Sequence, residues 1–487
     1  MTVLERSDRT GGKMADEVVG SAAIPSGPTV LTMKWAFDRL LEPTDLALGD
    51  LVKLHRCDVL ARHAWPDGSR LDLMADLDEA ADAIGRFAGP GDARGFRAFS
   101  EEASRIHDIL LEPHMRAQRP SFVGLMGRIG ARRLPDMMAL RPYTSLWRAL
   151  GQRFRDPRLR QLFGRYATYT GSSPYSIPAT LMLVAHVERE GVWRIEGGMS
   201  ALAAALRGLA ERLGVDFRTG QDAAGVVSEN GRAVAVTTGD GDLHPASAVV
   251  LNVDPSSAAR LSPESGVRAI PPSSRSLSAV TWCAKVRTSF PFAHHTVFFS
   301  DDYEREFREL RAGRVPDDPT TYACAPDRDD AGGRLNDAAD ERLLLLVNAP
   351  PNGDTRDHDP EAERCRDRMT ALLRRCGAEI EWVQARARTP TGFAALYPES
   401  GGALYGRTND GPFAGFKRPG ARTAVPNLTM AGGGCHPGPG VPMSTVSGML
   451  AAEHLMAALA STRLSRPAAI SGGISTGSAT TAAMPSP

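Results

Sequence analysis

An α/β fold is indicated by one stretch near the end of the chain, Leu428-Thr429-Met430-Ala431-Gly432-Gly433-Gly434-Cys435-His436-Pro437-Gly438-Pro439-Gly440-Val441. Its first four residues predict a last buried strand. Glycines and prolines then interrupt regular structure, and residues 441–459 carry the apolar pattern of a helix. Without side chains, the backbone of such a loop can approach a ligand closely, and the N–H groups at the start of the following helix favour negative charge. A glycine-rich turn before a packed helix would show the same pattern.

A second α/β signature stands at the start of the chain, where Thr2-Val3-Leu4 predicts a short strand and Glu5 follows it. In dinucleotide-binding folds the second parallel strand ends in an acid that accepts hydrogen bonds from the adenosine ribose. The glycine-rich phosphate loop of those folds precedes this acid by roughly 20 residues. We therefore expect that the chain starts late, after its first strand and phosphate loop. A surface strand followed by a turn is the alternative for this segment.

Between these ends the pattern changes several times. Short strands are expected over residues 42–73, including residues 51–54, and helical periodicity dominates residues 77–160. Residues 248–253 form a near-continuous apolar run, typical of a parallel strand buried on both faces. Strands return over residues 276–349. The sequence thus predicts an α/β protein with an interleaved second domain.

Composition excludes several classes of protein. Hydrophobic residues make up 42% and charged residues 23%, as in soluble globular proteins. The 57 basic and 57 acidic residues cancel, which argues against a nucleic-acid binder. No apolar run is long enough to predict a spanning helix. Six scattered cysteines without a C-x-x-C pair indicate a reduced, cytoplasmic protein.

We expect no metal site. The group that most resembles a ligand cluster is Asp357-His358-Asp359. It lies in the polar stretch of residues 352–364, which we interpret as a solvated loop.

An Arg-rich segment covers residues 115–155. It holds nine Arg and one acid, Asp136, interleaved with Met, Phe and Trp. Positive charge beside large apolar side chains suits a helix lying on a membrane surface. An Arg-rich amphipathic helix pair covering the core is an equally good interpretation of composition alone.

Several segments, taken in order, resemble the flavin-dependent carotenoid desaturases of the phytoene desaturase family. The likeness extends from Thr2 to about Ala460. The segments are E-R-x-D-R-x-G-G-K (residues 5–13), I-P-S-G-P-T-V-L-T-M (24–33), R-Y-A-T-Y-T-G-S-S-P-Y-S-I-P-A-T-L (165–181), W-R-I-E-G-G-M-S-A-L (193–202), H-H-T-V-F-F-S-D-D-Y-E-x-E-F (294–307), V-N-A-P-P (347–351) and A-G-G-G-C-H-P-G-P-G-V-P-M-S-T-V-S-G (431–448).

The last of these segments indicates a branch of the family. Met443 follows Pro442, where phytoene desaturases usually have a glycine. The form H-P-G-x-G-V-P-M looks more like hydroxyneurosporene or methoxyneurosporene desaturases of phototrophic bacteria, which make the 3,4 double bond of 1-hydroxy or 1-methoxy carotenoids.

The resemblance implies a cofactor, FAD, because hydride removal from an allylic C–C bond needs an acceptor that no side chain provides. A dry, aromatic-lined tunnel would help to stabilise a polyene cation, and no catalytic side chain is assigned. The implied cofactor residues are Glu5 at the ribose, Gly11, Gly12 and Lys13 at the pyrophosphate, and Gly27, Gly432, Gly433, Val441 and Met443. The implied contacts to a lipophilic carotenoid, or to the flavin, are Arg165, Tyr166 and Tyr169, whose alternative is ordinary helix packing.

The resemblance also implies the full organisation. We expect a Rossmann-like FAD-binding domain, N-terminally truncated, interleaved with an α+β substrate domain that carries a mixed or antiparallel sheet and a helical membrane-facing subdomain. Along the chain these are a first FAD-binding segment (1–75), the helical region (76–190), a second FAD-binding segment (191–275), the substrate-domain sheet (276–400), a third FAD-binding segment (401–464) and a disordered tail (465–487).

The expected protein is a cytoplasmic, peripherally membrane-associated desaturase that passes its electrons to oxygen or a quinone. A phytoene desaturase or a carotenoid isomerase-like flavoprotein is the alternative within the same class. A truncated remnant that lacks flavin and only binds lipid or a partner is the alternative from a different class.

Overall fold

A mixed sheet of seven strands is the largest layer in the computed structural model, which describes residues 1–118, 121, 124–125, 127 and 139–464. Its order is β17-β13-β16-β15-β14-β5-β6. All neighbours pair antiparallel except β14 and β5, which are parallel. The strands are β5 (Val59–Ala64), β6 (Arg70–Met74), β13 (Ser278–Arg287), β14 (His295–Phe298), β15 (Thr321–Cys324), β16 (Glu341–Ala349) and β17 (Glu381–Arg388).

The two faces of this sheet differ in chemistry. One face is apolar and packs on helix α13 (Ala362–Arg375), with Ala323 and Leu345 against Met369. Successive side chains of a strand point to opposite faces, so the neighbours of these apolar residues face the other way. The opposite face therefore presents His295 and Tyr322.

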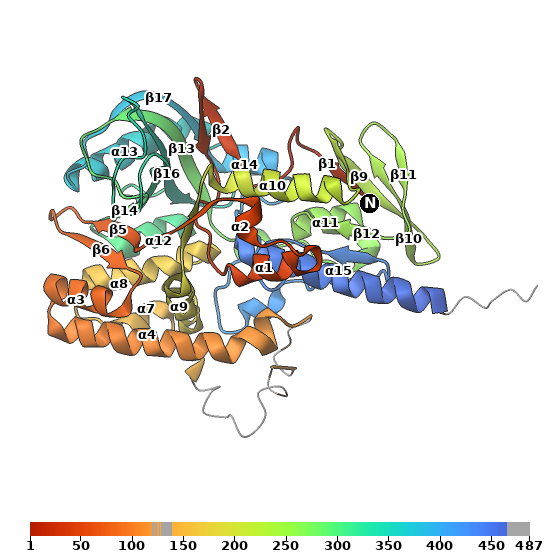
Figure 1. The fold of residues 1–487 in the computed structure, drawn as a ribbon, viewed down its shortest axis with the longest axis horizontal. Coiled ribbons are helices and arrows are strands. Elements are labelled where there is room, and N and C mark those ends of the chain that lie inside the picture. The colour runs from red at the N-terminus through yellow and green to blue at the C-terminus, as the bar shows by residue number, and fades with distance from the viewer. Residues whose placement is uncertain (119–120, 122–123, 126, 128–138, 465–487) are drawn as a thin grey trace, which may run out of the picture.

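A layer of helices lies beside the sheet (Figure 1). It confirms the helical pattern expected for residues 77–160 in the part of that range that the structure describes. Phe163 stacks among Phe96, Phe99 and Phe154, with ring centroids 4.8–5.7 Å apart, in one continuous core. The helices are α3 (Leu77–Ala88), α4 (Pro90–Leu110), α7 (Leu146–Gly151), α8 (Pro157–Gly164) and α9 (Leu183–Glu190), with the 3-10 helix η4 (Arg165–Thr170) after α8.

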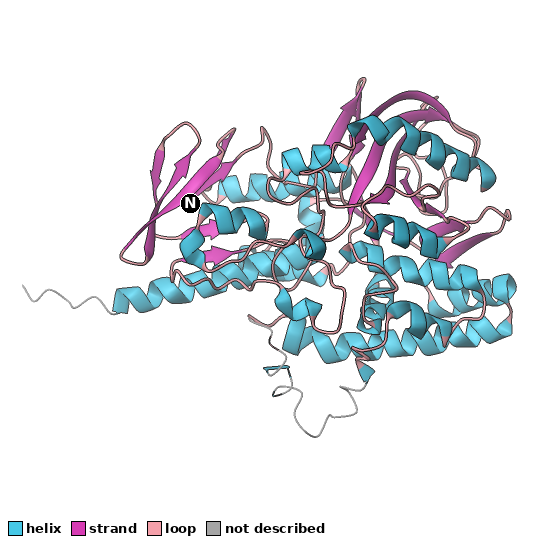
Figure 2. Cartoon of the chain, turned by 180° about the vertical axis from the view of Figure 1, so that it is seen from behind, coloured by secondary structure: helices cyan, strands magenta, loops and turns pink. Residues whose placement is uncertain are grey.

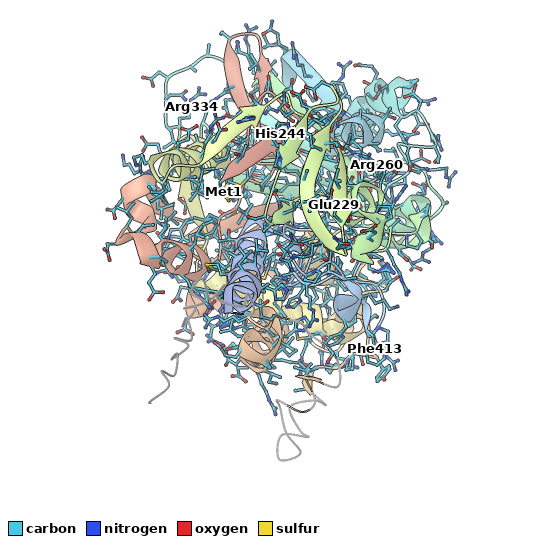
Figure 3. All side chains as sticks on the ribbon, turned by 90° about the vertical axis from the view of Figure 1, so that its right-hand side faces the viewer. Met1, Glu229, His244, Arg260, Arg334 and Phe413 are labelled. Atoms are coloured by element: carbon cyan, nitrogen blue, oxygen red, sulfur yellow. The ribbon has the colours of Figure 1, made fainter. Side chains whose placement is uncertain are left out.

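Segments far apart in the sequence pair at the other end of the molecule. β1 (Thr2–Glu5) runs parallel to β8 (Asp216–Thr219), and β12 (Val249–Leu251) runs parallel to β18 (Leu428–Met430). A three-stranded sheet flanks them. Figure 2 shows it beside the N-terminus, and Figure 3 shows it with Glu229 and His244 labelled. The flanking elements are β9 (Ala223–Glu229), β10 (Arg232–Thr238), β11 (Leu243–Pro245), α10 (Gly198–Arg212), α11 (Pro255–Leu261) and α15 (Val441–Leu464).

The strands predicted at both ends of the chain and the helix after Gly440 are confirmed. The expectation of strand at residues 51–54 is wrong for residues 51–53, because α2 (Leu48–Leu51) ends at Leu51 and the strand starts only at Leu54. Leu48 and Leu51 pack into the cluster around Phe37, and Asp50 accepts the Ala47 N–H at 2.7 Å. The remaining elements are β2 (Asp16–Val19), β3 (Ala22–Pro25), α1 (Trp35–Leu41), β4 (Leu54–Arg56), β7 (Trp193–Ile195), α12 (Tyr303–Arg311) and α14 (Pro390–Leu396).

Two predicted segments cannot be compared with the structure. Most of the Arg-rich segment, residues 119–120, 122–123, 126 and 128–138, and the tail of residues 465–487 lie outside the described residues. Within the described stretches of the chain, none of the helices has both the length and the hydropathy to cross a bilayer.

Helix α12 carries a buried acid, Glu306, which is 1% exposed. Its carboxylate accepts the Thr320 N–H at 3.1 Å and the Asn348 amide at 3.3 Å. Burial is the largest cause that raises the pKa of Glu306 to about 7, from an ordinary value of 4.5.

Replacing this acid should change how stability depends on pH. The native protein keeps the Glu306 proton up to about pH 7, whereas the unfolded chain loses it near pH 4.5. Wild-type stability should therefore fall between these values as pH rises. Glu306→Gln should exceed wild type by on the order of 3 kcal/mol in unfolding free energy above pH 7, with little gain at pH 4.5, in urea titrations. Glu304→Gln, on the exposed side of α12, is the control, and a pH-independent difference for Glu306→Gln would contradict the assignment.

Candidate functional site

The glycine loop after β18 is held by its neighbours at very short range. Gly432 has φ of +109°, and an added Cβ would lie 2.5 Å from Nδ2 of Asn252. Asn252 donates to the Ala431 carbonyl at 3.1 Å, and Ser447 of α15 accepts the Gly432 N–H at 3.2 Å. A side chain at position 432 would therefore displace the Asn252 amide from the Ala431 carbonyl, and the positive φ would strain it as well.

The N-terminal glycines make a second set of close contacts. Gly11 has φ of +105°, and a Cβ there would lie 2.9 Å from Cβ of Ala203 on α10. A Cβ on Gly27 would lie 1.7 Å from the Lys13 carbonyl oxygen. The loops of residues 11–13 and 26–29 therefore touch backbone to backbone.

Lys13 extends from these loops toward Tyr397 and Asp254. Its amine lies 4.3 Å from the ring centroid of Tyr397. Its side chain is exposed, yet desolvation by the surrounding protein lowers its pKa, while the charge of Asp254 opposes that effect. We interpret this combination as an amine in a concave but water-accessible place. Asp254 caps α11, and the next residue, Pro255, would lie 2.6 Å from a Cβ on Gly434.

The other predicted cofactor residues lie around the same region. Arg6, the neighbour of Glu5, donates to the Ala395 carbonyl at 3.0 Å, so the end of β1 lies near Tyr397. Burial raises the pKa of Tyr397, and the charge of Glu5 adds to that shift. Val441 packs on the cluster that contains Met14 and Leu202, and Met443 packs beside Met33 and Met115. Gly12 has open space around its Cα, and Gly433 would meet Ser444 at 3.1 Å. The structure thus brings the predicted N-terminal and C-terminal residues to one region, and their binding roles stay predictions.

The predicted substrate residues form a buried polar cluster with a glutamate. Arg165 Nη2 donates to Tyr169 Oη at 2.7 Å, and Tyr166 Oη donates to Glu188 Oε2 at 2.7 Å. Burial raises the pKa of Glu188, and the charge of Arg165 opposes this. Arg165 is 7% exposed, and its Nε has no hydrogen-bond partner within the described chain.

A second set of polar groups belongs to the sheet face opposite α13. Tyr322 Oη lies 2.6 Å from His295 Nδ1 and 2.6 Å from Thr29 Oγ1. Burial lowers the pKa of His295 well below its ordinary value, and the charges of His294 and Arg165 lower it further. Burial also lowers the pKa of His63 to about 3, again with help from Arg165. The charge of Arg165, in the first set, therefore acts on His63 and His295 of the second set.

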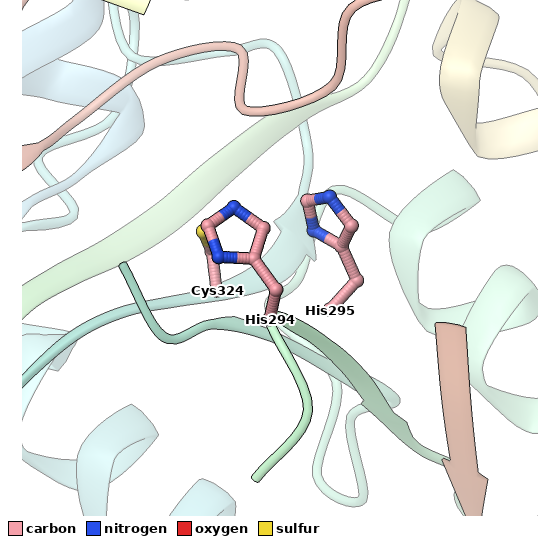
Figure 4. Close-up of side chains that lie close together, drawn as sticks. All are labelled: His294, His295 and Cys324. Carbon is pink, nitrogen blue, oxygen red and sulfur yellow. The ribbon is translucent and has the colours of Figure 1, made fainter. Parts of the chain in front are cut away.

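His294, His295 and Cys324 form a compact buried group (Figure 4) whose potential ligand atoms lie within 4.8 Å of one another. Hydrogen bonds account for much of this close grouping. His294 Nδ1 lies 3.1 Å from the carbonyl oxygens of Ala325 and Arg328, and its Nε2 lies 3.8 Å from Cys324 Sγ. The expectation that the protein holds no metal stays a prediction.

The interpretation of residues 352–364 as a solvated loop is wrong at His358. This side chain is 0% exposed, and its Nε2 lies 2.7 Å from Asn352 Oδ1. The backbone of His358 also donates to Thr391 Oγ1 at 2.8 Å, so the polar stretch folds onto the protein around an internal imidazole.

Sequence reasoning missed Thr29, Glu188, His295 and Tyr322. Thr29 and His295 stand inside the segments I-P-S-G-P-T and H-H-T-V-F-F, which the resemblance had already marked. Glu188 had no such signal, because only the fold places α9 against η4.

Comparison with known proteins identifies the family. The model of the flavin containing amine oxidoreductase family matches residues 1–456. The chain belongs to this family. The expectation of a flavin-dependent oxidoreductase is thereby confirmed.

Individual relatives agree with the resemblance found in the sequence. The chain is 45% identical to a hydroxyneurosporene desaturase of Rubrivivax gelatinosus, over 99% of this chain and 94% of that protein. It is 43% identical to a hydroxyneurosporene desaturase of Cereibacter sphaeroides, over 95% and 93%. An oxidoreductase of Methanosarcina mazei, 14% identical, shares the fold with a TM-score of 0.58 over 93% of this chain and 94% of that one.

Proposed function

We propose that this chain is an FAD-dependent desaturase that forms the 3,4 double bond of 1-hydroxy or 1-methoxy carotenoids. The observation that carries this proposal is the 45% identity to the Rubrivivax desaturase over nearly the whole chain. The buried clusters of Arg165 and His295 support it, because they provide a few polar groups in a site whose other walls must be apolar to hold a polyene.

The glycine contacts support a flavin site. The pyrophosphate would bind at Gly11, Gly12 and Lys13, which are exposed, so that their backbone and the Lys13 amine are accessible. Glu5 would accept hydrogen bonds from the ribose. Gly432, Gly433, Val441 and Met443 would hold the ring system at the start of α15, whose free N–H groups favour the negative charge of reduced flavin. Gly27 would keep the intervening loop close to Lys13. When bound, the flavin supplies the hydride acceptor.

Arg165, Tyr166 and Tyr169 are proposed to contact the substrate. They stand at the edge of the aromatic core, where Tyr166 packs with Phe163 at 6.1 Å between centroids. This core would exclude water from the reacting bond. A surface hollow of about 570 Å³ between α3, α4 and α9 is lined by charged Glu101, Asp108 and Arg189 among others, which does not suit a polyene.

The central test is the reaction itself. Detergent-solubilised enzyme with FAD should convert 1-hydroxyneurosporene to a product whose absorbance is shifted to the red by the added conjugated bond. The same assay with phytoene tests the phytoene desaturase alternative. Absence of product from the hydroxylated substrate, with a flavin-loaded protein in hand, would refute the proposal.

Flavin binding should depend on Lys13. We expect Lys13→Met to weaken FAD binding about 10-fold, the effect of losing a charge-assisted hydrogen bond of about 1.5 kcal/mol. Flavin fluorescence quenching on titration of apoprotein measures this. Lys53→Met, an exposed lysine paired with Glu196, is the matched control. A purified chain that never acquires a flavin spectrum would favour the flavin-free alternative.

We also propose that the protein attaches peripherally to a membrane surface and that oxygen or a quinone accepts its electrons. The Arg-rich segment supports attachment through its charge and its apolar side chains. We expect the protein to float with liposomes that contain anionic lipid and less with neutral ones, and equal recovery from both would contradict an electrostatic contribution.

A further inference from the structure

The seven-stranded sheet holds an unused hydrogen-bonding group inside the protein. His295 is 3% exposed, and its Nε2 has no hydrogen-bond partner within the described residues. A buried polar atom left unpaired is costly, and native proteins rarely keep one without a reason. The proposed flavin site does not use this atom.

Neighbouring groups fix the orientation of this imidazole. Tyr322 Oη lies 2.6 Å from both His295 Nδ1 and Thr29 Oγ1. We assign the ring proton to Nδ1, which donates to Tyr322, while the Tyr322 hydroxyl donates to Thr29. His295 Nε2 is then a fixed acceptor.

A matching donor lies in the adjoining cluster. Arg165 Nε is buried and has no partner in the described part of the chain, and a guanidinium can only donate. Tyr169, which accepts from Arg165, and Tyr322, which bonds to His295, pack against the same hydrophobic core, so the two clusters adjoin. The charge of Arg165 also contributes to the lowered pKa of His295. One acceptor and one donor are what an alcohol oxygen needs, because a hydroxyl both gives and accepts hydrogen bonds.

The cluster also reaches the proposed cofactor region. Thr29 follows Gly27 by two residues, and Gly27 lies against the Lys13 carbonyl. A polar substrate atom bound at His295 would therefore sit close to the loop that carries these contacts. In a 1-hydroxy carotenoid only two carbon–carbon bonds separate C1, which carries the oxygen, from C3.

We propose that His295 Nε2 and Arg165 Nε form a subsite for the oxygen on C1 of the carotenoid, which selects oxygenated substrates and fixes the position of the C3–C4 bond. This inference rests on the proposed function. His295 accepts the hydroxyl proton in a hydrogen bond and Arg165 donates to the oxygen, so no bond is broken in the subsite. The contact is one of recognition and positioning.

The test compares 1-hydroxyneurosporene with neurosporene, the same polyene without the oxygen. The readouts are kcat/KM and binding to fully reduced enzyme without air, where no turnover occurs. Wild type should prefer the hydroxylated substrate about 10-fold to 100-fold in both, since the analogue leaves both buried groups unpaired. His295→Phe should bring both ratios close to one, and His295→Gln, which keeps a polar group at the Nε2 position, should retain part of the preference.

His358→Phe is the matched control, because it also removes a buried imidazole but lies outside the cluster. It should leave the preference unchanged. If His295→Phe does not fold, Tyr322→Phe, which frees the His295 ring, should lower the preference to a lesser extent.

Three outcomes overturn the inference. The first is a wild-type enzyme with equal kcat/KM and equal binding for both polyenes. The second is a His295→Phe enzyme whose activity falls equally on both polyenes. The third, where Tyr322→Phe is measured instead, is a substrate preference equal to that of wild type. Failure of the proposed function looks different, because wild type would then desaturate neither polyene.

Discussion

Close contact at glycine is the constraint on which the site depends. Gly27 touches the Lys13 carbonyl, and Gly432 touches Asn252, at distances that leave no room for a Cβ. Segments more than 400 residues apart also meet in this region, because Val441 of α15 packs on the same cluster as Met14, while β12 pairs with β18. The parallel strands set the direction of each segment, and the glycines then set how closely the loops approach one another. A larger residue at position 27 would move the backbone of a loop, whereas one at position 432 would displace the Asn252 side chain from the Ala431 carbonyl.

The buried polar groups near Arg165 compensate one another's charge. A buried Arg165 and a buried Glu188 would each be costly alone, but Arg165 donates to the Tyr169 hydroxyl and Glu188 accepts from the Tyr166 hydroxyl, so each charge has a partner. The sheet face beside them has the neutral His63 and His295, which burial keeps unprotonated. The net effect is a region that offers hydrogen bonds without an uncompensated charge. Such a region can meet an oxygen atom at the end of a substrate while the surrounding Phe and Tyr side chains accommodate the polyene.

The sequence predicted the features of the site that depend on local chemistry. The strands at Thr2–Glu5 and Leu428–Met430 and the glycines that follow them have clear local signals. The position of His295 opposite α13 was beyond such reasoning, because it depends on the register of β14 with β15. The error at residues 51–54 arose because alternating and helical spacing cannot be told apart in so short a segment. The error at His358 had another cause, since polar composition does not reveal that one imidazole in a polar loop is buried.

The register of β14, β15 and β16 therefore determines which side chains face the site, and no sequence motif encodes that register. Thr296 pairs with Ala323, and Ala323 with Leu345, so His295 and Tyr322 point away from α13 while Ala323 and Leu345 point toward it. A slip of one residue between β14 and its neighbours would bury an imidazole against Met369 and Leu372 and expose apolar side chains on the site. The apolar core under α13 thus selects the register, and the register sets which polar groups face the site. In this way packing on one side of the sheet controls hydrogen bonding on the other, and a substitution in the core at Ala323 or Leu345 can alter the site without touching it.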